Sequence, residues 1–85
     1  MKSIEMSITN EAGIHARPAG EIVKKAKEFS STINISKDGK AVGATKLMSL
    51  LSLGVKQGDV VTITAEGDDE EAAAEAIAHV IRTEH

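Results

Sequence analysis

The stretch GIHARPAGEIVKKAKEF, residues 13–29, marks the first change from strand to helix along this chain. Before it, apolar and polar residues alternate at Ile4, Met6 and Ile8, which is the period of a strand with one buried face. Within the stretch, apolar residues recur every three or four positions, at Ala16, Ala19, Ile22, Val23, Ala26 and Phe29. This spacing predicts an amphipathic helix over residues 16–29.

Beyond this helix, the pattern predicts a hairpin and a second, shorter helix. Ile33 and Ile35 alternate with polar residues before the pair Asp38-Gly39, which is typical of a tight hairpin turn. The returning strand is short, over about residues 40–42. Residues 47–51 (LMSLL) then predict a short and strongly apolar helix, and Gly54 suits the left-handed position just beyond its end.

The last part of the chain predicts one more strand and one more helix. Val61, Ile63 and Ala65 alternate with polar residues as a strand does. The buried stripe of the last helix is expected at Ala73, Ala76, Ile77, Val80 and Ile81. Asp68 or Asp69 is expected to cap this helix. Four strands and three helices in this order predict an α+β domain of two layers, with a largely antiparallel sheet and the helices on one side of it.

Length and composition restrict the possible classes of protein. The 85 residues fit one domain over residues 1–85, and one Phe with no Trp or Tyr requires an aliphatic core. The absence of Cys excludes disulfides, thiolate metal sites and cysteine nucleophiles. The densest apolar stretch, residues 47–55, is too short to cross a bilayer, and no secretory signal is visible. We expect a cytoplasmic protein that does not insert into membranes, and a monomer.

Charge is divided unevenly along the chain. Residues 13–56 hold eight basic and three acidic side chains, whereas residues 57–85 hold eight acids and only Arg82 as a base. The basic part favours an anionic ligand or an acidic protein surface, although solvated helix faces explain single lysines equally well. Nucleic acid is not expected as a partner, because aromatic side chains for base stacking are almost absent and the net charge is −3.

Three histidines are candidates for chemistry at neutral pH. His79 is expected at the surface of the last helix, and His85, the last residue of the sequence, is expected to be disordered. Neither lies near other ligand-type residues with the spacing of a metal site, so we expect no metal. His15 is different, because the predicted helix begins immediately after it and Pro18 fits the first turn of that helix.

The position of His15 suits a nucleophile that takes up an anionic group. The positive end of a helix disfavours a protonated imidazole, which leaves a ring nitrogen free to react. The backbone amides of Ala16 and Arg17 then point toward bound phosphate oxygens, and the Arg17 guanidinium binds the same dianion. The alternative that the residues alone leave open is a histidine that only caps the helix.

The stretch GIHARPA, residues 13–19, resembles the phosphorylation-site signature of the HPr family. These are the histidine-containing phosphocarriers of the phosphoenolpyruvate-dependent sugar phosphotransferase system. The resemblance covers the whole chain, including DGK at 38–40, LMSLLSLG at 47–54 and AEGDDE at 65–70. It implies an open-faced β-sandwich, in which three helices cover a four-stranded antiparallel sheet in the order βαββαβα.

The resemblance also implies a function and a set of site residues. His15 would accept a phosphoryl group on Nδ1 from phosphorylated enzyme I and pass it to enzyme IIA domains, with Arg17 as the phosphate-binding partner. The implied docking surface comprises Ala16, Arg17, Gly20, Lys24, Lys27, Leu47, Met48 and Leu51. No cofactor is implied, and the protein would be a phosphoryl carrier rather than a free-standing enzyme.

The chain departs from the family pattern at the start of the short helix. Many members carry a regulatory serine there, whereas this chain has Lys46, preceded by Thr45. The nearest serine is Ser49, about one helical turn further along. We therefore expect no switch by serine phosphorylation, and we assign Lys46 to the rim of the docking surface.

Two alternative functions stay open at this point. One is a carrier in a regulatory, nitrogen-related branch of the phosphotransferase system. The other is an interaction or ligand-binding domain of ferredoxin-like type, which would need no reactive histidine.

Overall fold

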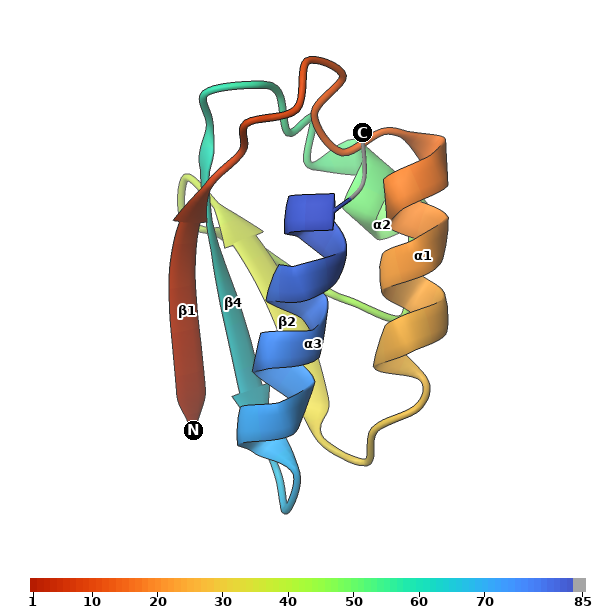
Figure 1. Cartoon of the computed structure of the whole chain (residues 1–85), viewed down its shortest axis with the longest axis vertical. Helices are drawn as coiled ribbons and strands as arrows, with labels where there is room; N and C mark the ends of the chain where they lie inside the picture. The colour runs from red at the N-terminus through yellow and green to blue at the C-terminus, as the bar shows by residue number, and fades with distance from the viewer. Residues whose placement is uncertain (84–85) are drawn as a thin grey trace.

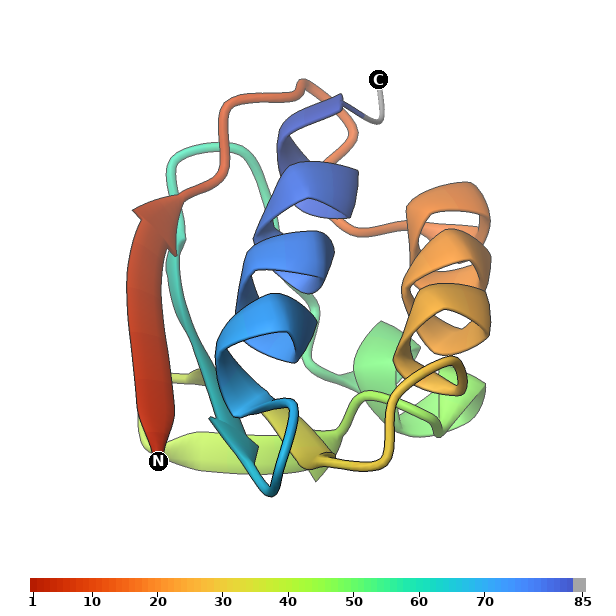
Figure 2. The same cartoon turned by 60° about the horizontal axis from the view of Figure 1, so that its bottom comes forward.

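The computed structural model describes residues 1–83 of the chain. In chain order the elements are β1 (Lys2–Ser7), α1 (Ala16–Ala26), β2 (Thr32–Lys37), β3 (Lys40–Gly43), α2 (Leu47–Ser52), β4 (Val60–Glu66) and α3 (Glu70–Thr83). This order is the predicted βαββαβα. Figure 1 shows the strands on one side of the molecule and the helices on the other, and Figure 2 shows the same two layers from a second direction.

The sheet has the order β1-β4-β2-β3, and every neighbouring pair of strands is antiparallel. One aliphatic residue from each strand falls into a single row across the sheet. Ile4 is opposite Ile63, Ile63 is also opposite Ile35, and Ile35 is opposite Val42. Because side chains alternate along a strand, such rows face the helices, while mostly polar residues, among them Ser3, Asn34 and Thr62, occupy the other face. The predicted fold class, an antiparallel sheet covered by three helices, is confirmed.

The core between the two layers is aliphatic, as expected from the composition. Its largest fully buried side chains are Ile22, Ile35, Leu50, Val61, Ile63, Ile77 and Pro18. The predicted stripe of α3 was too narrow, because Ala74 and Ala78 are also fully buried. The reason is that α3 contacts α1 as well as the sheet, so two of its faces are covered. Small residues on the second face let the helices approach closely.

Helix α1 ends three residues earlier than its apolar pattern predicted, at Ala26 rather than Phe29. Lys27 still bonds back to the Val23 carbonyl, but the next two amides reach only three residues back, Glu28 to Lys25 and Phe29 to Ala26. The chain therefore tightens into turns while Phe29 stays half-buried against the core. The hydrophobic pattern continued past the helix because packing, not helical geometry, requires an apolar residue at this position.

The predicted hairpin and the predicted end of the short helix are both confirmed. Asp38 and Gly39 have φ angles of 52° and 83°, which are the two left-handed positions of a type I′ turn. Gly54, directly after the C-cap Leu53, has a φ of 64°. Within residues 1–83, no helix is both long enough and apolar enough to pass through a membrane.

Asp69 holds the connection between α1 and β2 against the start of α3. Its carboxylate accepts hydrogen bonds from the Ser30 amide and the Ser31 amide, both at 2.9 Å, and from the Ser31 hydroxyl. Asp69, one of the two residues predicted to cap α3, accepts the Ala73 amide with its backbone carbonyl at 2.9 Å, while its side chain binds a segment far away in the sequence. The hydroxyl of Ser31 and then the amide of Ser30 lower the pKa of Asp69 below its ordinary value of 3.8.

The connection between β1 and α1 lies against the loop between α2 and β4, at the top of Figure 1. Ile8 donates to the Asp59 carbonyl and accepts from the Gly58 amide, both at 2.8 Å, and the Ile14 amide bonds the Val55 carbonyl at 3.1 Å. Between these bonds, Gly13 has a φ of 65°, and a Cβ placed on it would lie 2.2 Å from the Val55 carbonyl oxygen. Only glycine fits this approach of two backbones.

Replacing Gly13 with alanine is expected to destabilise the fold, whereas the same change at Gly20 is expected to stabilise it. The left-handed φ of Gly13 alone costs a non-glycine residue about 1–3 kcal/mol, and the backbone of Val55 adds a steric conflict. Gly20 lies in α1 with nothing within 4 Å of an added Cβ, so alanine there is expected to gain about 0.5–1 kcal/mol. Urea unfolding should show a lower free energy of unfolding for Gly13→Ala and a higher one for Gly20→Ala than for the parent. Equal changes in the two variants would contradict this prediction.

The contribution of Asp69 to stability is expected to depend on pH. Because hydrogen bonds lower the pKa of Asp69 in the folded state, its contribution is complete above pH about 4 and is lost as the pH falls through the lowered value. The free energy of unfolding of Asp69→Asn should therefore differ most from that of the parent at neutral pH. The difference should narrow in acid, as urea unfolding at a series of pH values would show. A difference that stays constant down to pH about 2 would contradict this assignment.

Candidate functional site

His15 is the N-cap residue of α1, with φ and ψ of −103° and −166°. Its carbonyl accepts the first intrahelical hydrogen bond, from the Ala19 amide at 3.0 Å. Its imidazole makes no capping hydrogen bond and is partly exposed. The alternative in which the ring only caps the helix therefore does not describe this residue, because the backbone of His15 does the capping and the ring is left for other chemistry.

The backbone on both sides of His15 is anchored in the interior. Ile14, one residue before, is 6% exposed, and Gly13 lies against the backbone of Val55. Pro18 and Ala19, in the first turn after it, are buried as well. Because both flanks are held, the imidazole projects from a fixed point on the surface. A reacting group gains from such anchoring, since its position relative to a substrate is set in advance.

The start of α1 forms an environment for an anion next to the imidazole. The amides of Ala16 and Arg17 precede the first intrahelical bond and point toward the N-terminal end of the helix. No acidic residue occupies the first turn of α1, so this turn contributes no carboxylate beside the position of an incoming phosphate. The side chain of Arg17 is exposed in the same turn. These groups together can hold a phosphoryl group on the imidazole.

The predicted docking residues lie on two helices that contact each other, α1 and α2. On α1 and its C-cap, all five predicted positions are exposed: Ala16, Arg17, Gly20, Lys24 and Lys27. On α2, Leu47 is 41% exposed and Met48 is 74% exposed, while Leu51 is half-buried and Leu50 is turned into the core. Lys46 is the exposed N-cap of α2. We call these nine residues, Leu50 excluded, the α1–α2 surface.

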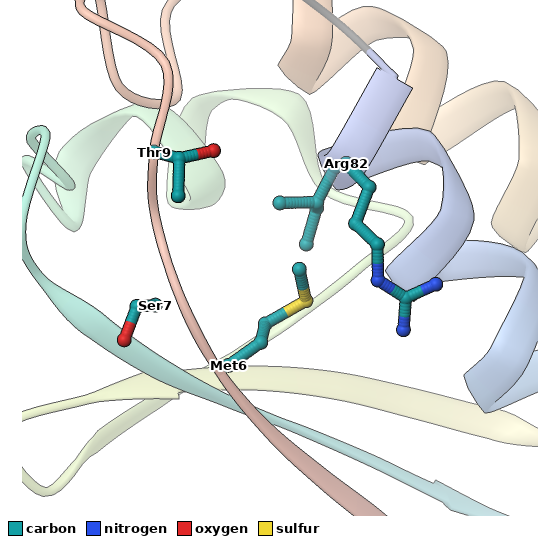
Figure 3. A pocket seen from close by; sticks show the side chains of 5 residues that line it. Met6, Ser7, Thr9 and Arg82 are labelled. Carbon is teal, nitrogen blue, oxygen red and sulfur yellow. The ribbon is translucent and has the colours of Figure 1, made fainter.

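His79, the other histidine among residues 1–83, lies outside this surface. His79 is exposed on α3, as expected, and His85 lies outside the described residues. Over residues 1–83, no three side chains of the His, Asp or Glu type come close enough together to hold a metal ion. A shallow hollow lies instead between the ends of β1 and α3, lined by Met6, Ser7, Thr9, Ile81 and Arg82. Figure 3 shows Met6 pointing toward the end of α3 and the Ser7 hydroxyl pointing away from it, so the polar groups of this hollow do not converge.

Sequence reasoning missed the support that the α2–β4 loop gives to His15. The Val55 backbone carbonyl bonds the Ile14 amide, and Val55 lies far from Ile14 in the sequence. A backbone contact of this kind has no side-chain signature. The single available signal was Gly13, because a glycine beside a candidate nucleophile indicates either a turn or a close approach of another backbone.

Comparison with known proteins identifies the family of the chain. The family model described as "PTS HPr component phosphorylation site" matches residues 2–83. The phosphocarrier protein HPr of Buchnera aphidicola subsp. Acyrthosiphon pisum is 44% identical over 77 residues, which are 91% of this chain and 91% of that protein.

Two solved structures from Thermoanaerobacter tengcongensis share this fold at 48% sequence identity. The crystal structure of HPr-C-His has a TM-score of 0.92 and covers 98% of this chain and 93% of that one. The crystal structure of an HPr dimer has a TM-score of 0.77, with coverages of 98% and 95%. The chain belongs to the HPr family of phosphocarrier proteins of the phosphotransferase system.

Proposed function

We propose that His15 is the residue on which this phosphocarrier holds its phosphoryl group. The observation that carries the proposal is that the backbone of His15 caps α1 while its imidazole does not. The carbonyl of His15 accepts from the Ala19 amide, while its imidazole makes no capping bond and stands partly exposed at the positive end of α1. A nucleophile in this position meets both the charge and the donors that a phosphate needs. We further propose that the whole chain acts as one HPr domain in the cytoplasm.

The transfer is an in-line displacement, in which the phosphoryl group passes from an atom of the partner to Nδ1 of His15. The lone pair of Nδ1 of His15 attacks the phosphorus of the phosphorylated partner, and a new N–P bond forms. The bond between phosphorus and the partner's atom breaks, and its electron pair stays with the partner. The amides of Ala16 and Arg17 and the Arg17 guanidinium stabilise the charge on the phosphoryl oxygens during this exchange. The same steps in reverse order deliver the group to the next protein.

The proposed partners are enzyme I as the donor and enzyme IIA domains as acceptors. The α1–α2 surface suits transient complexes with both, because its centre is apolar and its rim is basic. Leu47 and Met48 supply the exposed centre, and Lys24, Lys27 and Lys46 supply the rim. The basic rim favours partners with acidic surfaces and speeds their association. The expected monomer stays a prediction, since one similar HPr structure is a dimer.

We propose that Lys46 serves this rim instead of a regulatory switch. It occupies the N-cap of α2 without a capping side-chain bond, and it places a positive charge at the positive end of that helix. This position is mildly unfavourable for a lysine, by about 0.3–1 kcal/mol. Attraction to acidic partner surfaces offsets that cost in the complex.

The proposed role of His15 is tested by intact mass measurement after incubation with phosphoenolpyruvate and a general enzyme I. The parent chain should gain one phosphoryl group that is lost in mild acid, and His15→Ala should gain none. His79→Ala is the matched control, because His79 is exposed on α3 and lies outside the α1–α2 surface. Phosphate retained by His15→Ala, or lost in His79→Ala, would overturn the assignment.

Arg17→Ala is expected to slow transfer while leaving the fold intact. The Arg17 side chain is exposed, so its loss removes little packing, whereas a charge-assisted bond made in the transition state contributes about 10²-fold or more to the rate. Single-turnover transfer in both directions and thermal unfolding measure the two effects separately. Unchanged transfer, or a collapsed fold, would contradict the role of Arg17.

Met48→Glu is expected to weaken docking to enzyme I without affecting stability. Met48 is 74% exposed, so the change hardly affects packing within the protein. In the complex, it removes an apolar contact and places a negative charge against the acidic partner. The KM for the donor should rise about tenfold or more, as expected for a residue at the centre of an interface. Val60→Glu is the matched control, because Val60 is 47% exposed on β4, outside the α1–α2 surface. Equal effects of the two variants would remove Met48 from the docking surface.

A further inference from the structure

Lys37, at the end of β2, ties together both ends of the loop between α2 and β4. Its ammonium forms an ion pair with the Asp59 carboxylate at 2.9 Å and donates to the Gly54 carbonyl at 3.0 Å. Gly54 begins this loop and Asp59 closes it. The Lys37 side chain is only 18% exposed, so the pair is better shielded from water than an ordinary surface pair.

The Asp59 carboxylate also shapes the interior of the loop. It accepts the Lys56 amide at 2.8 Å, and the Asp59 amide donates to the Lys56 carbonyl at 3.0 Å. These two bonds close a tight turn that contains Gly58, with a φ of 92°. The Lys56 amide and then the Lys37 ammonium lower the pKa of Asp59 below its ordinary value, because both stabilise the charged carboxylate.

The loop shaped in this way is the support on which the His15 segment rests. Val55, next to Gly54, accepts the amide of Ile14, the residue directly before His15. Gly13 packs against the backbone of Val55 and Lys56, with no room for a Cβ. Further along the loop, the Gln57 side-chain amide donates to the Thr9 carbonyl at 3.1 Å, and Gly58 and Asp59 bond the backbone of Ile8. A shift of the loop would therefore move the residues that set the position of His15.

We propose that Lys37 and Asp59 are positioning residues for phosphoryl transfer, and that they act on His15 through the backbone of Val55, Gly13 and Ile14. This inference rests on His15 being the phosphoryl acceptor. The pair fixes the span of the loop from Gly54 to Asp59, and the loop fixes where α1 begins. Transfer requires Nδ1 to align with phosphorus and the donor atom, so small displacements of the imidazole reduce the rate steeply.

The test compares the parent with Lys37→Met, which keeps an unbranched apolar stem and removes the charge and the hydrogen-bond donors. The kcat for transfer from phosphorylated enzyme I should fall about tenfold, with KM for the donor unchanged, as expected when alignment is lost and docking is kept. Hydrogen exchange of the Ile14 amide should accelerate, and the ring-nitrogen chemical shifts of His15 should move. Lys37→Arg, which can still pair with Asp59, should restore all three readouts.

Asp59→Asn provides a second route to the same question. It removes the charge of the pair but keeps an oxygen that can accept the Lys56 amide. Because Lys37 and Asp59 act as one pair, the double variant should lose little more kcat than Lys37→Met alone. Additive losses would contradict the proposal, because they would mean that the two residues act separately.

Asp69→Asn is the control for loss of stability. Asp69 binds Ser30 and Ser31, which follow the C-terminal end of α1, whereas His15 caps its N-terminal end. Figure 1 shows these two ends of α1 at opposite ends of the molecule. When its loss of stability equals that of Lys37→Met, Asp69→Asn should leave the kcat for transfer unchanged. The proposal is wrong if Asp69→Asn lowers kcat as much as Lys37→Met. It is equally wrong if Lys37→Met changes only KM, which would make Lys37 a docking residue, or if the Lys37 and Asp59 variants fail to fold.

Failure of the proposed function gives a different result. In that case the parent itself takes no phosphoryl group on His15, whatever residue stands at position 37. The exchange rate of the Ile14 amide and the His15 ring shifts still measure, without any partner protein, whether the pair positions this segment. Unchanged values of both in Lys37→Met would overturn the positioning role independently.

Discussion

The close approach of two backbone segments, Gly13-Ile14 against Val55-Lys56, is the constraint on which the functional end of the molecule depends. A Cβ at Gly13 would lie 2.2 Å from the Val55 carbonyl oxygen, and the Ile14 amide bonds that same carbonyl. Helix α1 begins two residues after Ile14, at Ala16, so this contact sets the direction of the helix dipole and of its first amides. The position of the imidazole therefore depends on a contact between main chains.

The small core makes such backbone contacts necessary. Without Trp or Tyr, and with a single Phe, the two layers are held by isoleucine, leucine and valine between the sheet and α1, α2 and α3. Alanines on α1 and α3, among them Ala19, Ala26 and Ala74, let these two helices pack closely. The helices are therefore held rigidly over the sheet, but their short connections still need separate anchors. Asp69 supplies one anchor at one end of the molecule, and the loop from Gly54 to Asp59 supplies another at the end that carries His15.

The division of α2 between core and surface links the fold to recognition. Leu50 faces inward and is 1% exposed, whereas Met48 is 74% exposed two positions earlier. A helix of six residues cannot bury all of its apolar side chains against one neighbour, so an exposed apolar group remains beside the basic residues of α1. An uncovered group of this kind is unfavourable for an isolated protein and favourable for one that forms short-lived complexes. The family to which the chain belongs, phosphocarriers that exchange a phosphoryl group with other proteins, requires such complexes.

By itself, the sequence determined the order of the elements, the aliphatic core, the hairpin turn at Asp38-Gly39 and the candidate site at His15 and Arg17. These features depend on local periodicity, on turn residues and on a short motif, all of which can be read from neighbouring positions. The end of α1 was misjudged because Phe29 is apolar for packing outside the helix, and the stripe of α3 was misjudged because a second helix covers it. Only the tertiary structure decided that Asp69 binds Ser30 and Ser31, that Val55 supports Ile14, and that Lys37 pairs with Asp59. Each of these contacts joins residues far apart in the chain through a backbone group or a single charge. Backbone groups and single charges leave no periodic pattern in the sequence.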